Sequence, residues 1–497
     1  MAVSAERIND SYQAIDFYEE YLSLAGEDPK INYRLAEQYR RSRNYKKAAE
    51  HYRKAFEAEP SKFPKALFYE AEMLQSLGNY EEAIPLYEQF RKEYRGEKDA
   101  YTFGRRAKAA VEGCQLAMAD SLHQKVLIHH LNSSINKAHI ESSPILFGDK
   151  LLFTSLPMNS LEYFPIEGDS FPNRAFYNAV QENNEWKNKG LWKEISFPEG
   201  ANISSGAFSM DGNHFYFSVC GPGPFSNFIC KIWKAERFGK KWAEPQPLSD
   251  QVNSMRYTST QPAVGMDYKG REVLYFVSDR ADGKGGMDIW YSRYNQRQES
   301  FDEARNCGSK INTEGDELAP FIHSMNNSMY FSSNGHAGYG GLDVFKSAGE
   351  RGKWEEPENL GKPVNTPVDE LYYVLNEKGE QGLFASNRSE SVPLKNEHCC
   401  DDLYAFHFTD FISISAEGEV LSENGEKMTD VRIQLLQIPK GSEEGILLRE
   451  VNTADGTYKF NLEAGKSYKI TAKKQGYLLA EKNVSTESIT KSTQLKF

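Results

Sequence analysis

The sequence lacks the features that define several large classes of protein. No uninterrupted apolar stretch approaches the roughly 20 residues that a membrane-spanning helix needs. Asp and Glu (71) outnumber Lys and Arg (59), and the net charge of -12 argues against a nucleic-acid binder, which would need a basic face. Residues Met1 to Tyr12 do not combine a basic end with an apolar core, so no secretory signal is visible. Two alternatives remain: a cytoplasmic protein, or an exported one whose signal has been removed.

Recognisable catalytic motifs are absent as well. There is no nucleophile elbow, zincin helix or kinase signature, and Gly283-Lys284-Gly285-Gly286 does not have the Walker spacing. His398-Cys399-Cys400-Asp401 contains metal-binding side chains, but neighbours on a strand point to opposite faces and do not easily share one tetrahedral ion. We therefore predict no catalytic, cofactor-binding or metal-binding residues.

Cysteine is scarce, with six residues in 497. Cys220 and Cys230 flank a stretch rich in Gly and Pro that is able to bring their strands together, so they are the disulfide candidate. Such a bridge would indicate an oxidising compartment. Cys399-Cys400 is a candidate vicinal disulfide, Cys307 a buried thiol and Cys114 a core residue of a helix.

What the chain does contain is repetition. Asn306–Thr313 leads to Asp316-Glu317, and the nearly identical Asn359–Thr366 leads to Asp369-Glu370. Repeats of short strands at this period are typical of β-propeller blades, because one four-stranded sheet cannot bury both of its faces alone. Five phenylalanines mark strand endings that we interpret as the inner strands of five blades within residues 123–408: Phe153, Phe217, Phe276, Phe331 and Phe384. We expect the strand in Val126–Ile135 to close the ring beside the last blade, and Gly200-Ala201-Asn202 to be one of the recurring connectors.

The first 122 residues have helical periodicity with a longer period laid over it. Ala48 and Tyr52 recur as Ala83 and Tyr87, an offset of 35 residues that resembles the tetratricopeptide repeat. One face of successive first helices should line a concave groove that holds a partner segment, or should instead dock on the chain's own propeller. The groove candidates are Tyr33, Glu37, Arg40, Phe68, Glu72 and Gln75.

Two further family resemblances follow. Gly285-Gly286-Met287-Asp288-Ile289-Trp290 and its repeats resemble the TolB-type propeller; the recurring Asp either caps a turn or bridges blades, or belongs to a shared ligand site. Residues 411–497 alternate apolar and polar residues between turns and resemble the carboxypeptidase regulatory-like β-sandwich. The expected fold is thus multidomain, α then all-β: a helical tetratricopeptide array, a five-bladed β-propeller and a β-sandwich.

This order of modules resembles the PorE-like periplasmic proteins of Bacteroidota, which are associated with type IX secretion and gliding. The resemblance implies a non-catalytic periplasmic scaffold, not an enzyme, that joins an outer-membrane protein complex to other envelope proteins. It would reach peptidoglycan through an OmpA-like domain that does not follow Phe497 here. Two alternatives stay open: a propeller that binds a peptide or glycan ligand, and a hydrolase on a propeller scaffold. The hydrolase would need an acid–base pair drawn from loop residues: Asp279, Arg280, Asp282, Asp288 and Asp343.

Overall fold

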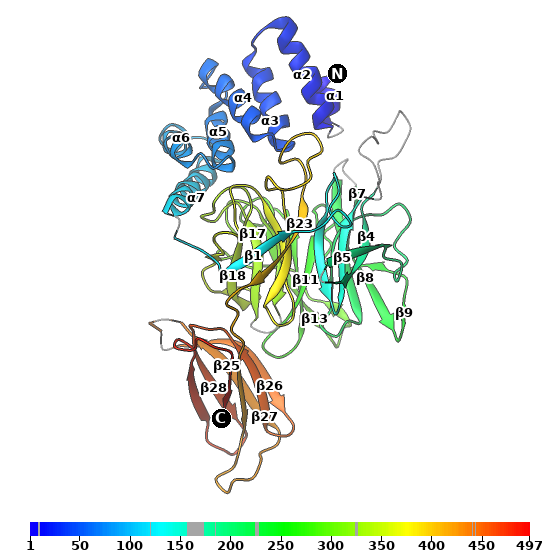
Figure 1. Ribbon diagram of the computed structural model, residues 1–497, viewed down its shortest axis with the longest axis vertical. Coiled ribbons are helices and arrows are strands. Elements are labelled where there is room, and N and C mark those ends of the chain that lie inside the picture. Colours follow the sequence, from blue (N-terminus) through cyan, green and yellow to red (C-terminus); the bar gives the residue numbers. More distant parts are fainter. Residues whose placement is uncertain are drawn as a thin grey trace.

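The computed structural model describes residues 1–7, 10–119, 121–156, 173–183, 185–223, 228–323, 327–439, 441–442 and 444–497. Three regions follow one another along the long axis: helices at one end, a ring of β-sheets in the middle and a smaller β-domain at the other end (Figure 1). The protein is therefore mostly β with a helical N-terminal region. Among the described helices, none is both long and apolar enough to cross a membrane.

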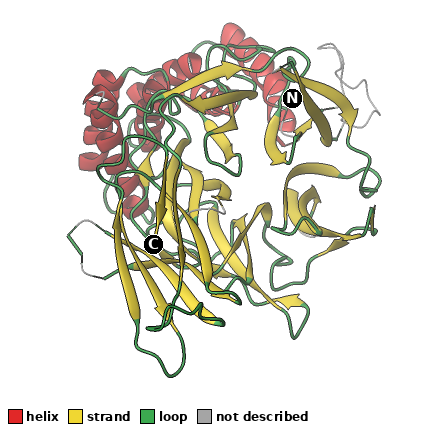
Figure 2. Ribbon diagram, turned by 60° about the horizontal axis from the view of Figure 1, so that its bottom comes forward, coloured by secondary structure: helices red, strands yellow, loops and turns green. Residues whose placement is uncertain are grey.

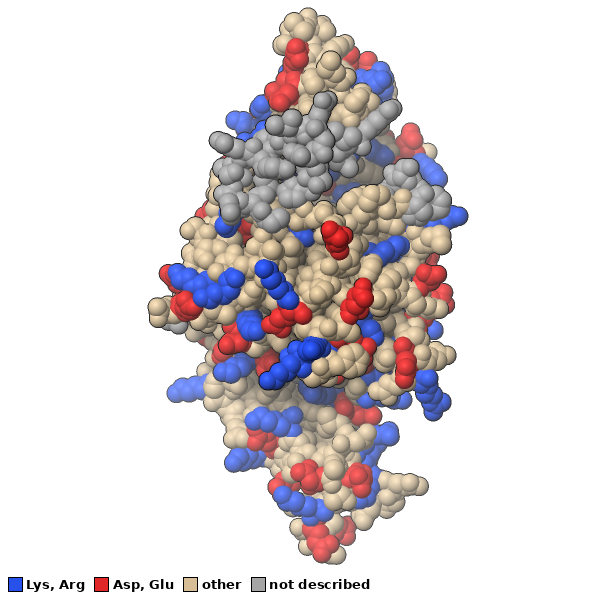
Figure 3. Space-filling view, turned by 90° about the vertical axis from the view of Figure 1, so that its right-hand side faces the viewer, with Lys and Arg blue, Asp and Glu red and all other residues tan. Residues whose placement is uncertain are grey.

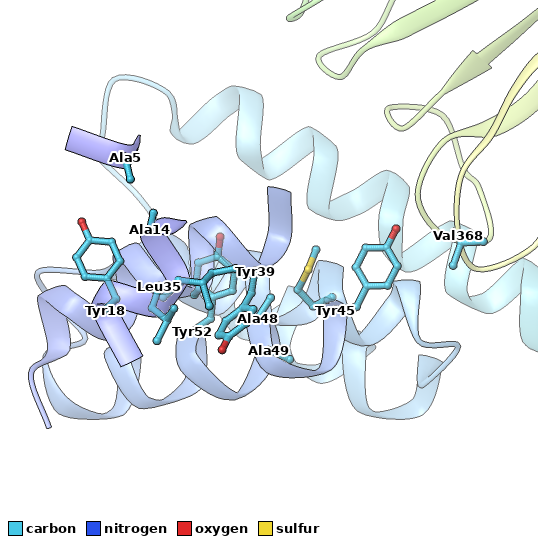
Figure 4. Close-up of a cluster of buried hydrophobic side chains, with 14 residues drawn as sticks. Ala5, Ala14, Tyr18, Leu35, Tyr39, Tyr45, Ala48, Ala49, Tyr52 and Val368 are labelled. Carbon is cyan, nitrogen blue, oxygen red and sulfur yellow. The ribbon is translucent and has the colours of Figure 1, made fainter. Parts of the chain in front are cut away.

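The N-terminal region is a stack of helices in which each packs on the next. Local sequence signals start them: Asp28 accepts hydrogen bonds from the backbone N–H groups of Lys30 and Ile31, and Pro29 holds the first helical position of α3. Buried alanines such as Ala48 allow close approach, and aromatic rings fill the spaces between helices (Figure 4). The helices are α1 (Ala2–Arg7), α2 (Ser11–Ala25), α3 (Pro29–Arg41), α4 (Tyr45–Ala58), α5 (Pro64–Ser76), α6 (Tyr80–Glu93) and α7 (Ala100–Ala119).

Within the described residues, five antiparallel sheets surround the central axis, and we call them blades 1 to 5 (Figure 2). Blade 1 has β2 (Ser142–Phe147), β3 (Lys150–Ser155), β4 (Ala175–Glu182) and β5 (Glu185–Leu191); blade 2 has β6 (Asn202–Phe208), β7 (His214–Pro222), β8 (Phe228–Phe238), β9 (Lys241–Trp242) and β10 (Gln246–Pro247). Blade 3 has β11 (Thr260–Met266), β12 (Glu272–Ser278), β13 (Asp288–Asn295), β14 (Ser300–Phe301) and β15 (Arg305–Asn306). Blade 4 has β16 (Glu317–His323), β17 (Ser328–Ser333), β18 (Asp343–Glu350), β19 (Lys353–Trp354) and β20 (Glu358–Asn359); blade 5 has β21 (Glu370–Leu375), β22 (Gln381–Ser386), β23 (Asp402–Phe408) and β1 (Val126–His130).

The innermost strands differ from those that the sequence suggests. Strands β2, β6, β11, β16 and β21 contact one another across neighbouring blades and surround the axis. The phenylalanine-marked endings belong to β3, β7, β12, β17 and β22, which are the second strands. The interpretation of those endings as inner strands is therefore wrong. Second strands are covered on both faces by neighbouring blades, so they carry the stronger apolar signal.

The ring is closed by a strand from outside the last blade's own sequence. Strand β1 pairs antiparallel with β23, from Val126 opposite Phe408 to His130 opposite Tyr404. The predicted closure beside the last blade is confirmed by this register.

Four of the five seams between blades share one hydrogen-bonded device, which we call the Asn clamp. A buried asparagine in the connector bonds both the N–H and the C=O of a residue on the third strand of the preceding blade. Asn312, for example, accepts from Ile289 N at 2.8 Å and donates to Ile289 O at 2.9 Å. The clamped pairs are Asn136–Leu403, Asn253–Ile232, Asn312–Ile289 and Asn365–Val344.

The seam between blades 1 and 2 is built differently. Its connector begins at Trp192, whose N–H bonds Phe176 O just as Leu360 N bonds Val344 O in a clamped seam. Five residues later stands Phe197, whereas Asn365 stands five residues after Leu360. Phe197 packs on Phe176, Trp192 and, edge to face, Phe217. This seam is therefore held by aromatic packing.

The predicted connector Gly200-Ala201-Asn202 does not have the role of the other four. Asn202 is the first residue of β6 and accepts a hydrogen bond from Arg174 N at 3.2 Å. The equivalent connector lies earlier, at residues 192–197.

The C-terminal domain contains two sheets around a shared apolar core. Their strand orders are β27-β24-β30 and β26-β25-β28-β29. The domain contacts blade 4 through the ion pair Lys346–Glu463 and the hydrogen bond from Gln437 to Glu355. The strands are β24 (Ile414–Glu419), β25 (Val431–Ile438), β26 (Ile446–Thr453), β27 (Thr457–Leu462), β28 (Ser467–Lys473), β29 (Ala480–Ser485) and β30 (Thr493–Lys496).

Candidate functional site

A cavity of about 480 Å³ lies inside the ring, bounded by the five innermost strands. In Figure 2, which brings the C-terminal domain forward, those strands surround the open centre of the ring. A cavity of this size suits a small ligand, and the axis of a propeller is a place where side chains from five blades converge.

Every innermost strand has an irregular register at one level of the ring. The interruptions fall at residues 143–144, 204–205, 261–262, 319–320 and 372–373. The first bulge residue has a left-handed backbone in four blades: Ser143, Gln261, Ala319 and Tyr372, with φ between 49° and 54°. Non-glycine residues adopt this conformation at a cost of roughly 1–3 kcal/mol each, and such strain concentrates at functional sites. Bulges also redirect side chains, here at one level around the axis.

The floor of the cavity is a hydrogen-bonded bridge between blades. Gln261 Nε2 donates to the Tyr372 hydroxyl at 3.0 Å, and Gln261 Oε1 accepts from Ala319 N at 2.7 Å. Burial raises the pKa of Tyr372, so the phenol stays neutral. Its oxygen already accepts from Gln261, and no acceptor for its own proton is found in the described part of the chain. The floor therefore offers a hydrogen-bond donor to a ligand.

The walls above this floor are apolar. In three blades the second bulge residue is a proline. Proline has no backbone N–H, so no hydrogen bond of the strand pairing is lost at these positions: Pro144, Pro262 and Pro320. Further apolar lining comes from the following positions of the same strands: Ile145, Ala207, Ala263, Phe321 and Val374. The sequence reasoning missed this site, although the Ser-Pro, Gln-Pro and Ala-Pro dipeptides were its visible signal.

The mouth of the cavity has an aromatic side and a polar side. Phe147 of β2 stacks on Phe208 of β6, with ring centroids 4.1 Å apart and planes 22° apart. The polar side has His323, which hydrogen-bonds Asn376 O at 3.1 Å, and the exposed pair Glu377 and Lys378. Glu377 is the one carboxylate among the described lining residues.

The six groove candidates are divided by the structure. Tyr33 stacks on Phe63, with centroids 5.3 Å apart, and Glu37 forms an ion pair with Arg40 at 3.0 Å. Tyr33 and Glu37 line an open groove of the helical stack together with Arg34 and other residues. The remaining candidates line a different cavity, of about 290 Å³, between the helices and the propeller: Arg40, Phe68, Glu72 and Gln75.

The prediction that Phe68 faces a partner is wrong. Its side chain is 2% exposed and packs in a helical core cluster with Tyr87, Phe90 and Phe103. The closing helix α7 covers the face that the repeat pattern left open. Glu72 forms an ion pair with Arg106 at 2.9 Å, and Gln75 Nε2 donates to Gly338 O of the propeller at 3.2 Å. This face of α5 therefore meets the chain's own propeller.

The cysteines and the recurring aspartates lie away from the central cavity. Cys220 and Cys230 are opposite each other on β7 and β8 and are disulfide-bonded; residues 224–227 of the intervening loop lie outside the described residues. Cys399 and Cys400 also form a disulfide, whereas Cys114 and Cys307 are buried free thiols.

Each recurring aspartate caps its own loop. Asp288 accepts from Lys284 N at 2.5 Å and Gly285 N at 3.1 Å, and Asp343 accepts from Gly340 N at 3.1 Å. Burial raises the pKa of both carboxyls. None of the five acid–base candidates, Asp279, Arg280, Asp282, Asp288 and Asp343, lines the central cavity. Across the residues that the structure describes, no three His, Cys, Asp or Glu side chains gather in a metal-binding group.

Comparison with known proteins gives neighbours by structure alone. No family model matches the chain, and no curated protein does. Similar solved structures include an endo-arabinase from Bacteroides thetaiotaomicron, with 12% identity over 56% of this chain and 96% of that one and a TM-score of 0.37. An exo-β-1,3-galactanase from Clostridium thermocellum has 13% identity over 74% of this chain and 88% of that one, also with a TM-score of 0.37. A GH43 β-xylosidase/α-arabinofuranosidase from a compost metagenome has 12% identity over 61% and 98%, with a TM-score of 0.35.

These neighbours correct one expectation from the sequence. The chain was expected to be a non-catalytic scaffold and not an enzyme, yet the similar structures are named as an endo-arabinase, a β-xylosidase/α-arabinofuranosidase and an exo-β-1,3-galactanase. That expectation is contradicted and is not kept.

The face shown in Figure 3 has no patch of charge of one sign among the residues that the structure describes. There, Lys and Arg side chains are interspersed with Asp and Glu over the ring and the C-terminal domain. The central cavity, whose charged lining residues Glu377 and Lys378 lie at its mouth, is therefore the feature on which a function is best argued.

Proposed function

We propose that this protein is a propeller that binds a carbohydrate ligand in its central cavity. The observation that carries the proposal is the neutral polar floor of Gln261 and Tyr372 beneath apolar walls, in a cavity of about 480 Å³. A sugar presents hydroxyl groups at its edges and C–H groups on its faces. It therefore matches a site that combines hydrogen-bonding groups with apolar and aromatic surface.

The charge of the site favours a sugar over a peptide as the ligand. An extended peptide is usually held by backbone hydrogen bonds along a sheet edge. Here the innermost strands are the edges of their sheets, but each is interrupted by a bulge at the floor, and the charged side chains Glu377 and Lys378 stand only at the mouth.

Binding of an oligosaccharide panel, measured by titration calorimetry, tests the proposal. Tyr372→Phe removes the donor at the floor, and we expect it to weaken binding about five- to tenfold. Tyr257→Phe is the matched control, because Tyr257 does not line the cavity. Release of reducing ends from the same oligosaccharides, followed over time, separates binding from turnover. If no oligosaccharide binds, or Tyr372→Phe binds as well as the wild type, the proposal is wrong.

We also propose finer assignments for the two flanking regions. The 35-residue offset supports a tetratricopeptide-like array in the helices, and the two small sheets support a regulatory-like sandwich at the C-terminus. The two disulfides support an oxidising compartment such as the periplasm. Envelope proteins as partners stay a prediction, for which the groove at Tyr33 and Glu37 is the available surface.

A further inference from the structure

The depth of the central cavity sets a minimum size for its ligand. Phe147 at the mouth lies four positions after the bulge residue Ser143 in β2, and both residues line the cavity. At about 3.3 Å per strand residue, floor and mouth are roughly 13 Å apart. A single sugar ring is only a few ångströms across, far less than this distance. One ring therefore cannot touch the floor and the mouth together.

The floor also limits which part of a saccharide chain is able to enter the cavity. The hydrogen bonds from Gln261 to Tyr372 and from Ala319 to Gln261 join three blades across the axis. The lining begins at this level and includes no residue of the innermost strands before the bulges. The cavity therefore ends at this level, and a ligand that reaches the floor enters with one end first.

The mouth provides a flat surface for a second sugar ring. Phe208 is held in place by Trp192, Phe215 and Trp242, so it supports Phe147 from behind. Phe147 stacks one face on Phe208 and is 37% exposed. The negative face of an aromatic ring attracts the partially positive C–H groups on the face of a sugar.

We infer that the cavity recognises the end of a linear oligosaccharide of at least two residues. The terminal residue occupies the floor at Gln261 and Tyr372, and a following residue stacks on Phe147. This inference rests on the proposed function. It adds the minimum length of the ligand, the requirement for a free end, and Phe147 as the residue that contacts the second sugar ring.

The experiment uses the full chain with malto-, xylo-, galacto- and chito-oligosaccharides of one to seven residues, and with β-cyclodextrin as a ring without ends. We expect affinity to rise from one residue to two or three and then to level off. The cyclodextrin should bind much more weakly than the linear malto-oligosaccharide of seven residues. Phe147→Leu, which stays apolar but has no aromatic face, should weaken binding of the longer oligosaccharides about tenfold.

Two variants make the result specific. Phe147→Trp should keep the affinity of the wild type, because it preserves an aromatic face. Phe238→Leu should change nothing, because Phe238 is an exposed phenylalanine outside the cavity. Thermal midpoints of all variants should stay close to that of the wild type, which excludes loss of folding as the cause.

The outcomes separate this inference from the proposed function. If linear and cyclic sugars bind alike, or Phe147→Leu binds the longer oligosaccharides as tightly as the wild type does, the inference is overturned. Binding that still depends on Tyr372 would in that case preserve the proposed function. If none of the sugars binds, both fail.

Discussion

Four seams of the ring hold neighbouring blades together with one kind of interaction, and the seam between blades 1 and 2 uses another. The four are joined by a buried asparagine that satisfies the backbone of the preceding blade; the fifth has Phe197 at the corresponding spacing and a cluster of aromatic rings. An Asn clamp is directional and fixes the position of one strand against the next, since both of its bonds have strict geometry. Aromatic packing depends instead on the apolar area that the rings bury and on how their shapes fit together.

The aromatic seam also carries the stacked aromatic pair at the mouth of the candidate site. Phe147 of blade 1 and Phe208 of blade 2 stack across it at the mouth of the cavity. The repeated motif thus accounts for structure, and the departure from the repeat coincides with the aromatic side of the mouth, where we place the second sugar ring. Three predictions test how far this contrast holds.

The largest effect is expected from breaking a clamp. Asn312 is 1% exposed, bonds Ile289 twice and also donates to Asn306 Oδ1 at 2.9 Å. Asn312→Ala leaves a buried N–H and a buried C=O without their partner, at a cost of about 3 kcal/mol in the free energy of unfolding. Urea unfolding followed by tryptophan fluorescence measures the loss.

Asn202→Ala is the matched control for this clamp. Asn202 accepts one hydrogen bond, from Arg174 N, in the seam that has no clamp, so its removal should cost no more than about 1 kcal/mol. Equal losses for the two variants would show that the clamp has no special role.

Truncating the aromatic counterpart should have a smaller effect. Phe197→Ala removes contacts with Phe176, Trp192 and Phe217, but Phe197 is only partly buried. We expect a loss of about 2 kcal/mol, below the range for fully buried phenylalanines. The same variant should also weaken oligosaccharide binding less than Phe147→Leu does, since Phe197 does not line the cavity. A stronger binding defect than that of Phe147→Leu would mean that the seam itself, and not the stacked ring, controls the site.

The sequence predicted the repeated parts of the molecule and missed the convergent ones. The connectors ending at Asn312-Thr313 and Asn365-Thr366 are visible because each acts locally on the neighbouring strand, so its pattern recurs along the chain. The cavity combines single residues such as Gln261 and Tyr372, far apart in sequence, and bulges break the alternation that would reveal their strands.

The helices show the same limit of prediction from the sequence. The tyrosines that mark their period, Tyr52 and Tyr87, are buried. The period does not indicate which remaining face is covered later, and Phe68 is buried by α7, more than 30 residues further along the chain.

The smallest predicted effect is a pH dependence of the free energy of unfolding, which distinguishes the polar connector motif from the aromatic seam. Glu317, in the connector motif of blade 4, accepts hydrogen bonds from Thr313 and Ser333, and complete burial raises its pKa to about 8. A carboxyl group whose pKa is higher in the folded than in the unfolded protein binds protons on folding. Its contribution to stability is therefore full below the unfolded pKa, near 4.5, and is lost as the pH rises through 8. From pH 6 to pH 7 this loss is about 1 kcal/mol.

Glu317→Gln removes the titrating proton and keeps the shape of the side chain. The unfolding free energy of the wild type minus that of the variant should therefore fall as the pH rises from 6 to 8. The difference between wild type and Phe197→Ala should stay constant over the same range, because no proton is exchanged in aromatic packing. A wild-type minus Glu317→Gln difference that does not change with pH would mean that Glu317 is ionised in the folded ring. The polar motif would then stabilise blade 4 through a charged carboxylate, and the contrast between a pH-sensitive and a pH-insensitive part of the ring would be lost.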